Sequence, residues 1–186
     1  TWLCITGGEP LMHPEFETIY KELAQMGFFI TLQTNASLIQ GKAAKLLEDY
    51  PPKGVKITLY GASDETYEAV CGVKEGLKKV NAGIQTLKHL EIPVQLVSTV
   101  IRQNLDDVQK MAFYAYINGL PWMATGGVKQ SARGADSEAK DVRVEENLEA
   151  QRKESIRRRL KEAPVNIERK PCTYCKDYRL AYWVTW

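Results

Sequence analysis

Strand-like and helix-like runs alternate along most of this chain, and this alternation constrains the fold more than any other feature. Short runs rich in β-branched or aromatic residues predict strands at about 2–6, 28–34, 54–60, 93–101 and 121–126. Between them, apolar residues at three- and four-residue spacing predict helices at about 14–26, 38–49, 74–90 and 105–118. Such units form either an open doubly wound sheet or a closed or partial (β/α) barrel, and periodicity alone does not choose between the two.

In both architectures ligands collect at the carboxyl ends of the strands. We therefore expect the loops that follow the strands to share one rim, after residues Thr6, Thr34, Tyr60, Ile101 and Gly126. Local signals accompany two of these loops. Ser63 or Asp64 is predicted to cap a short helix after Gly61, and Asn104 is predicted to cap the helix that follows it.

Composition and charge exclude several classes of function. The chain has 25 basic and 23 acidic residues and a net charge of +2, so no overall field attracts nucleic acid. The basic stretch from Arg152 to Lys161 lacks aromatic residues for base stacking, and we interpret it as a solvated helix face. No run approaches the roughly 20 apolar residues of a membrane-spanning helix. Four cysteines form no dense disulfide framework, which favours a reducing cytoplasm.

The sequence Gly-Gly-Glu-Pro at residues 7–10 is the most informative motif. Two glycines let the backbone turn tightly near a ligand, Pro10 stiffens the exit, and Glu9 offers a carboxylate to an ammonium group. Taken alone, the motif also suits an ordinary strand-to-helix loop. In its context it resembles the methionine-binding motif of radical S-adenosylmethionine (SAM) enzymes. The resemblance implies that Gly7, Gly8 and Glu9 bind the amino group of SAM, with Pro10 in the same cofactor-binding turn.

Further stretches follow in the order of the same family. Residues 32–35 resemble the end of its third strand, with Ala36 in place of the usual glycine, and imply that Asn35 reaches the ribose or the methionine carboxylate. Residues 57–67 resemble the fourth-strand segment of peptide-modifying members and imply that the Thr58 hydroxyl faces SAM.

Residues 98–104 resemble the fifth-strand end of the family and place Thr99 and Arg102 at or near the rim. A guanidinium group suits two-point recognition of a carboxylate, so Arg102 or Arg133 is a candidate to pair with the SAM carboxylate. Either arginine also suits a surface position.

The cysteines divide into two groups. Cys4 and Cys71 are interpreted as packing residues. Cys172 and Cys175 form a Cys-x-x-Cys pair that resembles the start of the SPASM extension of radical SAM enzymes and implies ligands for an auxiliary iron-sulfur cluster. The family usually carries glycine where Cys175 stands, which makes Cys172 the better-supported ligand. Half of a zinc knuckle and a redox-active dithiol are the alternatives.

The resemblance also implies a [4Fe-4S] cluster held by a Cys-x3-Cys-x2-Cys loop, which this sequence does not contain and which is expected to precede Thr1. The predicted fold is therefore an α/β, TIM-like partial barrel over residues 1–164, truncated at its first strand. The start of a SPASM-like extension is predicted at 165–186.

The implied function of the intact parent is reductive cleavage of SAM to a 5′-deoxyadenosyl radical that abstracts hydrogen from a peptide or protein. A flavodoxin or ferredoxin is the implied electron donor, and the fragment alone is expected to be inactive. Two alternatives remain at this stage: a non-catalytic SAM-binding or zinc-knuckle scaffold, and an ordinary barrel lyase or aldolase. Against the last, no lysine lies at a strand end.

Overall fold

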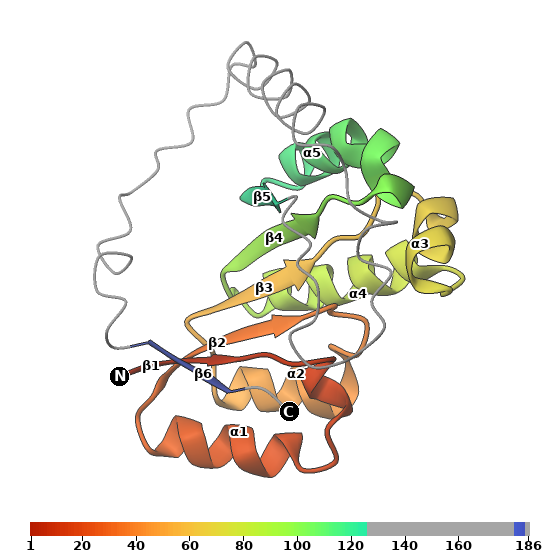
Figure 1. Cartoon of the computed structure of the whole chain (residues 1–186). Helices are drawn as coiled ribbons and strands as arrows, with labels where there is room; N and C mark the ends of the chain where they lie inside the picture. The colour runs from red at the N-terminus through yellow and green to blue at the C-terminus, as the bar shows by residue number, and fades with distance from the viewer. Residues whose placement is uncertain (126–180, 185–186) are drawn as a thin grey trace, which may run out of the picture.

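The computed structural model describes residues 1–125 and 181–184. Its strands form one open, six-stranded sheet in the order β5-β4-β3-β2-β1-β6, and every neighbouring pair is parallel (Figure 1). The strands are β1 (Trp2–Ile5), β2 (Phe29–Thr34), β3 (Gly54–Thr58), β4 (Val94–Thr99), β5 (Trp122–Thr125) and β6 (Ala181–Val184). The α/β prediction is confirmed, and the open, consecutively ordered sheet agrees with a partial barrel.

Helices occupy the connections between β1 and β5, as the periodicity predicted. They are α1 (Phe16–Gln25), α2 (Gly41–Asp49), α3 (Asp64–Cys71), α4 (Gly76–His89) and α5 (Val108–Ile117), with 3-10 turns η1 (Pro10–Met12) and η2 (Arg102–Asp107). The helix expected from residue 105 begins at Val108, because the residues before it form η2. In the described part of the chain, no helix has both the length and the apolar character needed to cross a membrane.

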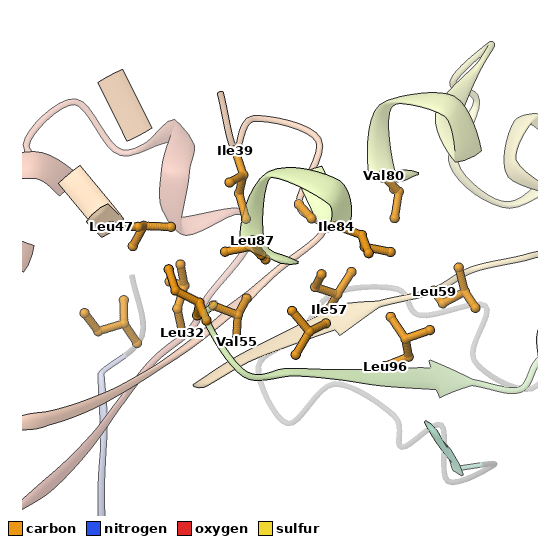
Figure 2. Close-up of a cluster of buried hydrophobic side chains, with 14 of the residues drawn as sticks. Leu32, Ile39, Leu47, Val55, Ile57, Leu59, Val80, Ile84, Leu87 and Leu96 are labelled. Carbon is orange, nitrogen blue, oxygen red and sulfur yellow. The ribbon is translucent and has the colours of Figure 1, made fainter. Parts of the chain in front are cut away.

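The core lies on one face of the sheet. In β1 to β4 alternate side chains are buried, and the side chains between them stay partly exposed. The buried strand residues form one cluster with apolar side chains of the helices. Figure 2 shows Leu32, Val55, Ile57 and Leu96 of the strands beside Ile84 and its neighbours on α4. The helices described here therefore stabilise the sheet from this core face.

The opposite face of the sheet, which we call the open face, carries polar side chains beside apolar ones such as Phe29 and Val97. Its half-exposed polar side chains on β2, β3 and β4 include Thr31, Gln33, Lys56, Thr58 and Gln95. Parallel sheets are commonly covered on both faces and apolar on both. A row of polar groups on central strands therefore indicates that this face meets something other than a hydrophobic core.

Within residues 165–186, predicted to be the start of a SPASM-like extension, the structure describes β6. It pairs in parallel with β1, from Trp2 opposite Ala181 to Ile5 opposite Val184, so it lies on the edge of the same sheet. The boundary predicted near residue 165 lies outside the described residues, as does the basic stretch from Arg152 to Lys161.

Candidate functional site

The turn after β1 follows from its sequence. Gly7 adopts φ 145°, in the half of backbone space that glycine enters most readily. Pro10 then occupies the first position of η1, where no backbone N–H is needed. Glu9 precedes it as the N-cap, and its carboxylate accepts a hydrogen bond from the Leu11 backbone N–H at 3.2 Å.

The Glu9 carboxylate is also held from the neighbouring strand. The Thr34 hydroxyl donates to Oε1 at 2.6 Å, and the Asn35 backbone N–H donates to Oε2 at 2.7 Å. A carboxylate offers about four lone-pair positions, and three are used here. None of the ion pairs within residues 1–125 involves Glu9. The group is thus a half-buried, oriented anion with capacity for one more donor, which is the chemistry that an ammonium ligand requires.

The loop after β2 holds Thr34 and Asn35, which donate hydrogen bonds to the Glu9 carboxylate. Ala36 takes φ 63°, so the alanine adopts the left-handed conformation expected for the glycine it replaces. Its N–H donates to the Thr34 hydroxyl oxygen at 3.0 Å, and the Ser37 N–H donates to Asn35 Oδ1 at 2.9 Å. These short-range bonds orient Thr34 and Asn35 toward Glu9.

The carboxyl ends of β3 and β4 are joined by Asn104, which is 1% exposed. Its amide nitrogen donates to the carbonyl oxygens of Tyr60 and Thr99, each at 3.0 Å, and its Oδ1 accepts from the Ile101 N–H at 2.9 Å. Asn104 does not lie at the start of α5, which begins at Val108; its side chain caps the N-terminus of η2 from the third position of that turn and also satisfies backbone groups of two strand ends. The sequence carried no signal for this long-range contact.

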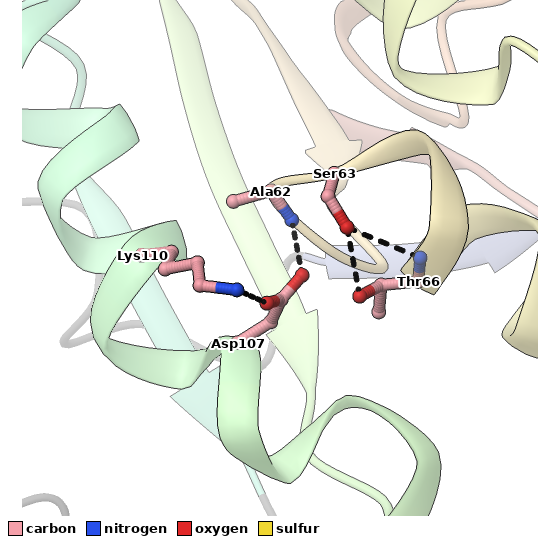
Figure 3. Close-up of polar contacts among 5 residues, drawn as sticks. All are labelled: Ala62, Ser63, Thr66, Asp107 and Lys110. Carbon is pink, nitrogen blue, oxygen red and sulfur yellow. Dashed lines mark hydrogen bonds and ion pairs between the residues drawn. The ribbon is translucent and has the colours of Figure 1, made fainter.

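Asp107 fastens the loop after β3 to η2 and α5 (Figure 3). Its side chain is 4% exposed, and it accepts from the Ala62 N–H at 3.1 Å and from Lys110 Nζ at 2.8 Å. Burial raises the pKa of this carboxyl, but hydrogen bonds from Lys110, Thr66 and Ala62 outweigh burial and hold the pKa below its usual value. In the same loop Ser63 caps α3 by accepting from the Thr66 N–H, which confirms its predicted role.

The other residues predicted to bind SAM lie at the ends of β3 and β4, in η2, or outside the described residues. Thr58 ends β3 and Thr99 ends β4, and both are half-exposed on the open face at the rim. Arg102 begins η2 and is exposed. The structure thus brings Gly7–Pro10 and Asn35 together on adjacent strand ends, with Thr58 on the next strand. Arg133 lies outside the described residues.

The two described cysteines differ from expectation. Cys4 is only half-buried, and burial raises the pKa of its thiol while the nearby Lys56 acts in the opposite direction. Cys71 is exposed at the end of α3, so its interpretation as a packing residue is wrong. The described residues contain no group of three metal-binding side chains. Cys172 and Cys175 lie outside them.

The sequence of this chain is similar to a protein family and to several characterised proteins. The family model described as the Radical SAM superfamily matches residues 3–115. The AdoMet-dependent heme synthase of Methanosarcina barkeri is 28% identical over 108 residues, which are 58% of this chain and 31% of that protein. The PqqA peptide cyclase of Ruegeria pomeroyi is 24% identical over 108 residues, 58% of this chain and 29% of the relative. The chain therefore spans less than a third of these two relatives.

Solved structures share the fold. SuiB of Streptococcus suis superimposes with a TM-score of 0.67 at 12% identity, covering 100% of this chain and 39% of SuiB. The enzyme anSMEcpe with bound AdoMet gives a TM-score of 0.64 at 18% identity, covering 87% of this chain and 46% of that protein.

Proposed function

The chain belongs to the radical SAM superfamily, and on that premise we propose that its strand ends bind SAM as part of an enzyme that modifies a peptide or protein. The observation that carries the proposal is the Glu9 carboxylate, held by Thr34 and Asn35 with one acceptor position left. The ammonium of the SAM methionine moiety is a matching donor, and a charge-assisted bond to a fixed carboxylate is among the stronger hydrogen bonds.

Each strand end has a distinct part in this proposal. The turn of Gly7 and Gly8 brings backbone close to the methionine moiety, because no side chain stands in the way. Asn35 and Thr58 lie farther along the rim, where Asn35 contacts the ribose or the methionine carboxylate in this proposal and the Thr58 hydroxyl faces SAM. Thr99 and Arg102 are proposed contacts on the far side, and Arg133, which lies outside the described residues, is the alternative to Arg102 for pairing with the SAM carboxylate. Asn104 and Asp107 do not touch the ligand in this scheme, and they hold the loops after β3 and β4 in position.

In this superfamily, SAM would supply a 5′-deoxyadenosyl radical for hydrogen abstraction from the substrate, and a [4Fe-4S] cluster would supply the electron that this chemistry needs. The described residues provide no set of three cysteines to hold such a cluster. In this proposal, the role of residues 1–125 is to bind and orient SAM through Glu9 and its neighbours. Cys172 and Cys175 remain proposed ligands of an auxiliary cluster, and a flavodoxin or ferredoxin remains the proposed electron donor.

A peptide or protein substrate is supported by two observations. Residues 57–67 resemble the fourth-strand segment of peptide-modifying members, and one relative is a PqqA peptide cyclase. The names of other relatives, a heme synthase and a GTP 3′,8-cyclase, point to different substrates. The fourth-strand segment is the feature that favours a peptide.

Calorimetric titration of the 186-residue chain with SAM tests the proposal. Glu9→Gln keeps the size of the side chain but removes its charge, and we expect the affinity for SAM to fall about tenfold or more. Glu17→Gln is the matched control, because Glu17 is an exposed glutamate on α1 and its loss should leave the affinity unchanged. Equal affinity of the wild-type chain and Glu9→Gln would contradict the assigned role.

Thr34 gives a second, graded test of the same contact. Thr34→Val removes the hydroxyl that orients Glu9, whereas Thr34→Ser retains it. We expect weaker SAM binding from the valine variant and near wild-type binding from the serine variant. The opposite order would show that the Thr34 hydroxyl does not position the carboxylate.

A further inference from the structure

Three long polar side chains stand side by side on the open face of the sheet. Gln33 of β2 pairs in register with Lys56 of β3, and Lys56 pairs in register with Gln95 of β4. All three are half-exposed. Because neighbouring strands lie about 4.8 Å apart and paired residues point the same way, these side chains form one transverse row. We call it the donor row.

Among the residues that the structure describes, the side-chain hydrogen bond of Gln33 leaves the donors of the donor row available. The amide oxygen of Gln33 accepts a hydrogen bond from the Thr6 hydroxyl at 3.1 Å, and this bond does not use the Gln33 NH₂ group. Lys56 carries three N–H donors and a positive charge. Within residues 1–125, no carboxylate forms an ion pair with Lys56. The row therefore offers several donors and one positive charge, with no anion from the described residues to balance them.

The position of Lys56 is unusual for a surface lysine. β3 is a central strand, and both faces of a central parallel strand are commonly apolar. Placing a lysine there between two glutamines forgoes apolar contacts across three strands. A ligand that compensates for these missing apolar contacts must be polar and must accept hydrogen bonds.

We propose that the donor row binds a carboxylate of the substrate. The inference rests on the proposed function, because it names a chemical group of the molecule that the enzyme modifies. One positive charge flanked by amide donors matches a singly charged, planar carboxylate, whose two oxygens can each accept from a different donor. An acidic side chain of a peptide is the form of carboxylate that agrees with the proposed peptide substrate.

The donor row is separate from the place proposed for SAM. Lys56 precedes Thr58 by two residues, so it lies about 7 Å farther from the rim along the same face of β3. Glu9 lies beyond the carboxyl end of β1, the strand next to β2, and so near the Gln33 end of the row rather than the Gln95 end. A substrate carboxylate on the row would thus lie below the bound SAM, on the face toward which Thr58 points.

An NMR titration of the labelled 186-residue chain tests the subsite. The probes are an acetylated and amidated pentapeptide with one central glutamate, the same peptide with glutamine, and glutarate. We expect the glutamate peptide to shift the side-chain amide signals of Gln33 and Gln95 saturably, and the glutamine peptide to shift neither. Lys56→Met should weaken binding about tenfold or more, because a charge-assisted bond is lost, whereas Lys56→Arg should retain it. Lys42→Met, at an exposed position on α2, is the control.

Each outcome decides the proposal. Saturable binding of glutarate but not of the peptide would support the carboxylate subsite and assign it to a small-molecule substrate. Equal shifts from the glutamate and glutamine peptides, or unchanged binding in Lys56→Met with its fold intact by circular dichroism, would overturn the subsite. Loss of SAM affinity in Lys56→Met would also overturn it, since the row would then bind the carboxylate of SAM itself.

The same titrations separate this inference from the proposed function. Glu9→Gln should lose SAM affinity and keep binding of the glutamate peptide, and Lys56→Met should do the reverse. If the wild-type chain binds the peptide but not SAM, the proposed function fails while the subsite stands. If it binds SAM but not the peptide or glutarate, the subsite fails alone.

Discussion

Replacing Gly83 by alanine tests how closely α4 must approach the loop that carries Asn35. A Cβ atom at Gly83 would lie 2.2 Å from the carbonyl oxygen of Ala36. It would also lie 3.1 Å from the carbonyl carbon of Ala36 and 3.1 Å from the Cβ atom of Ala36. These are mostly backbone atoms of a buried loop, so no side chain can rotate away. To restore an ordinary contact, α4 or the loop must move by about 1 Å, which a closely packed interior resists.

Helix propensity and the close contact predict changes of opposite sign in the free energy of unfolding for Gly83→Ala. In an exposed helix interior, changing glycine to alanine stabilises by about 1 kcal/mol. Overpacking of a core typically costs about 1–3 kcal/mol, and a backbone obstacle belongs to the upper part of that range. We therefore expect Gly83→Ala to lower the free energy of unfolding by about 1–2 kcal/mol, although propensity alone predicts an increase.

Urea unfolding followed by circular dichroism measures this difference. Gln85→Ala and Gln85→Gly provide the propensity reference, because Gln85 is an exposed position on the same helix. A Gly83→Ala variant as stable as the wild-type chain, or more stable, would refute the close approach. If the approach is real, the displaced loop should also move the Asn35 N–H away from Glu9 and weaken SAM binding.

The buried polar side chains behind the rim give two further predictions. At neutral pH, Asp107→Asn should lower the free energy of unfolding by about 1–3 kcal/mol, because it weakens the bonds to Ala62 and Lys110. The pKa of Asp107 is lowered on folding, so its contribution exists above the unfolded-state pKa and is lost as the pH falls through the folded-state pKa. Urea unfolding at pH 7 and below pH 4 should therefore show the difference between wild type and variant shrinking in acid, and a constant difference would contradict the lowered pKa. Asn104→Asp should destabilise by about 2 kcal/mol or more, since a carboxylate would face the carbonyl oxygens of Tyr60 and Thr99, while Asn118→Asp, on a half-exposed asparagine, serves as the milder comparison.

Much of the candidate site could be anticipated because its signals are local. The Gly7–Pro10 turn, the Ser63 cap and the positions of strand ends depend on neighbouring residues, so the sequence predicted them. The long-range contacts of Asn104 and the exposure of Cys71 could not be anticipated in this way. Asn104 bonds to Tyr60, 44 residues away, and no spacing in the chain marks that partner. Cys71 is exposed because of where α3 lies in the fold, which an apolar sequence context did not indicate.

The sequence by itself determined the alternation of strands and helices, the parallel α/β class and the shared rim of loops, because hydrophobic periodicity and turn residues act over a few positions. Only the tertiary structure decided which groups meet. It joined Glu9 to Thr34 and Asn35, and it aligned the donor row on one face. Register between strands depends on contacts among residues that are distant in sequence, so a binding site assembled from several strand ends is fixed only when the sheet forms.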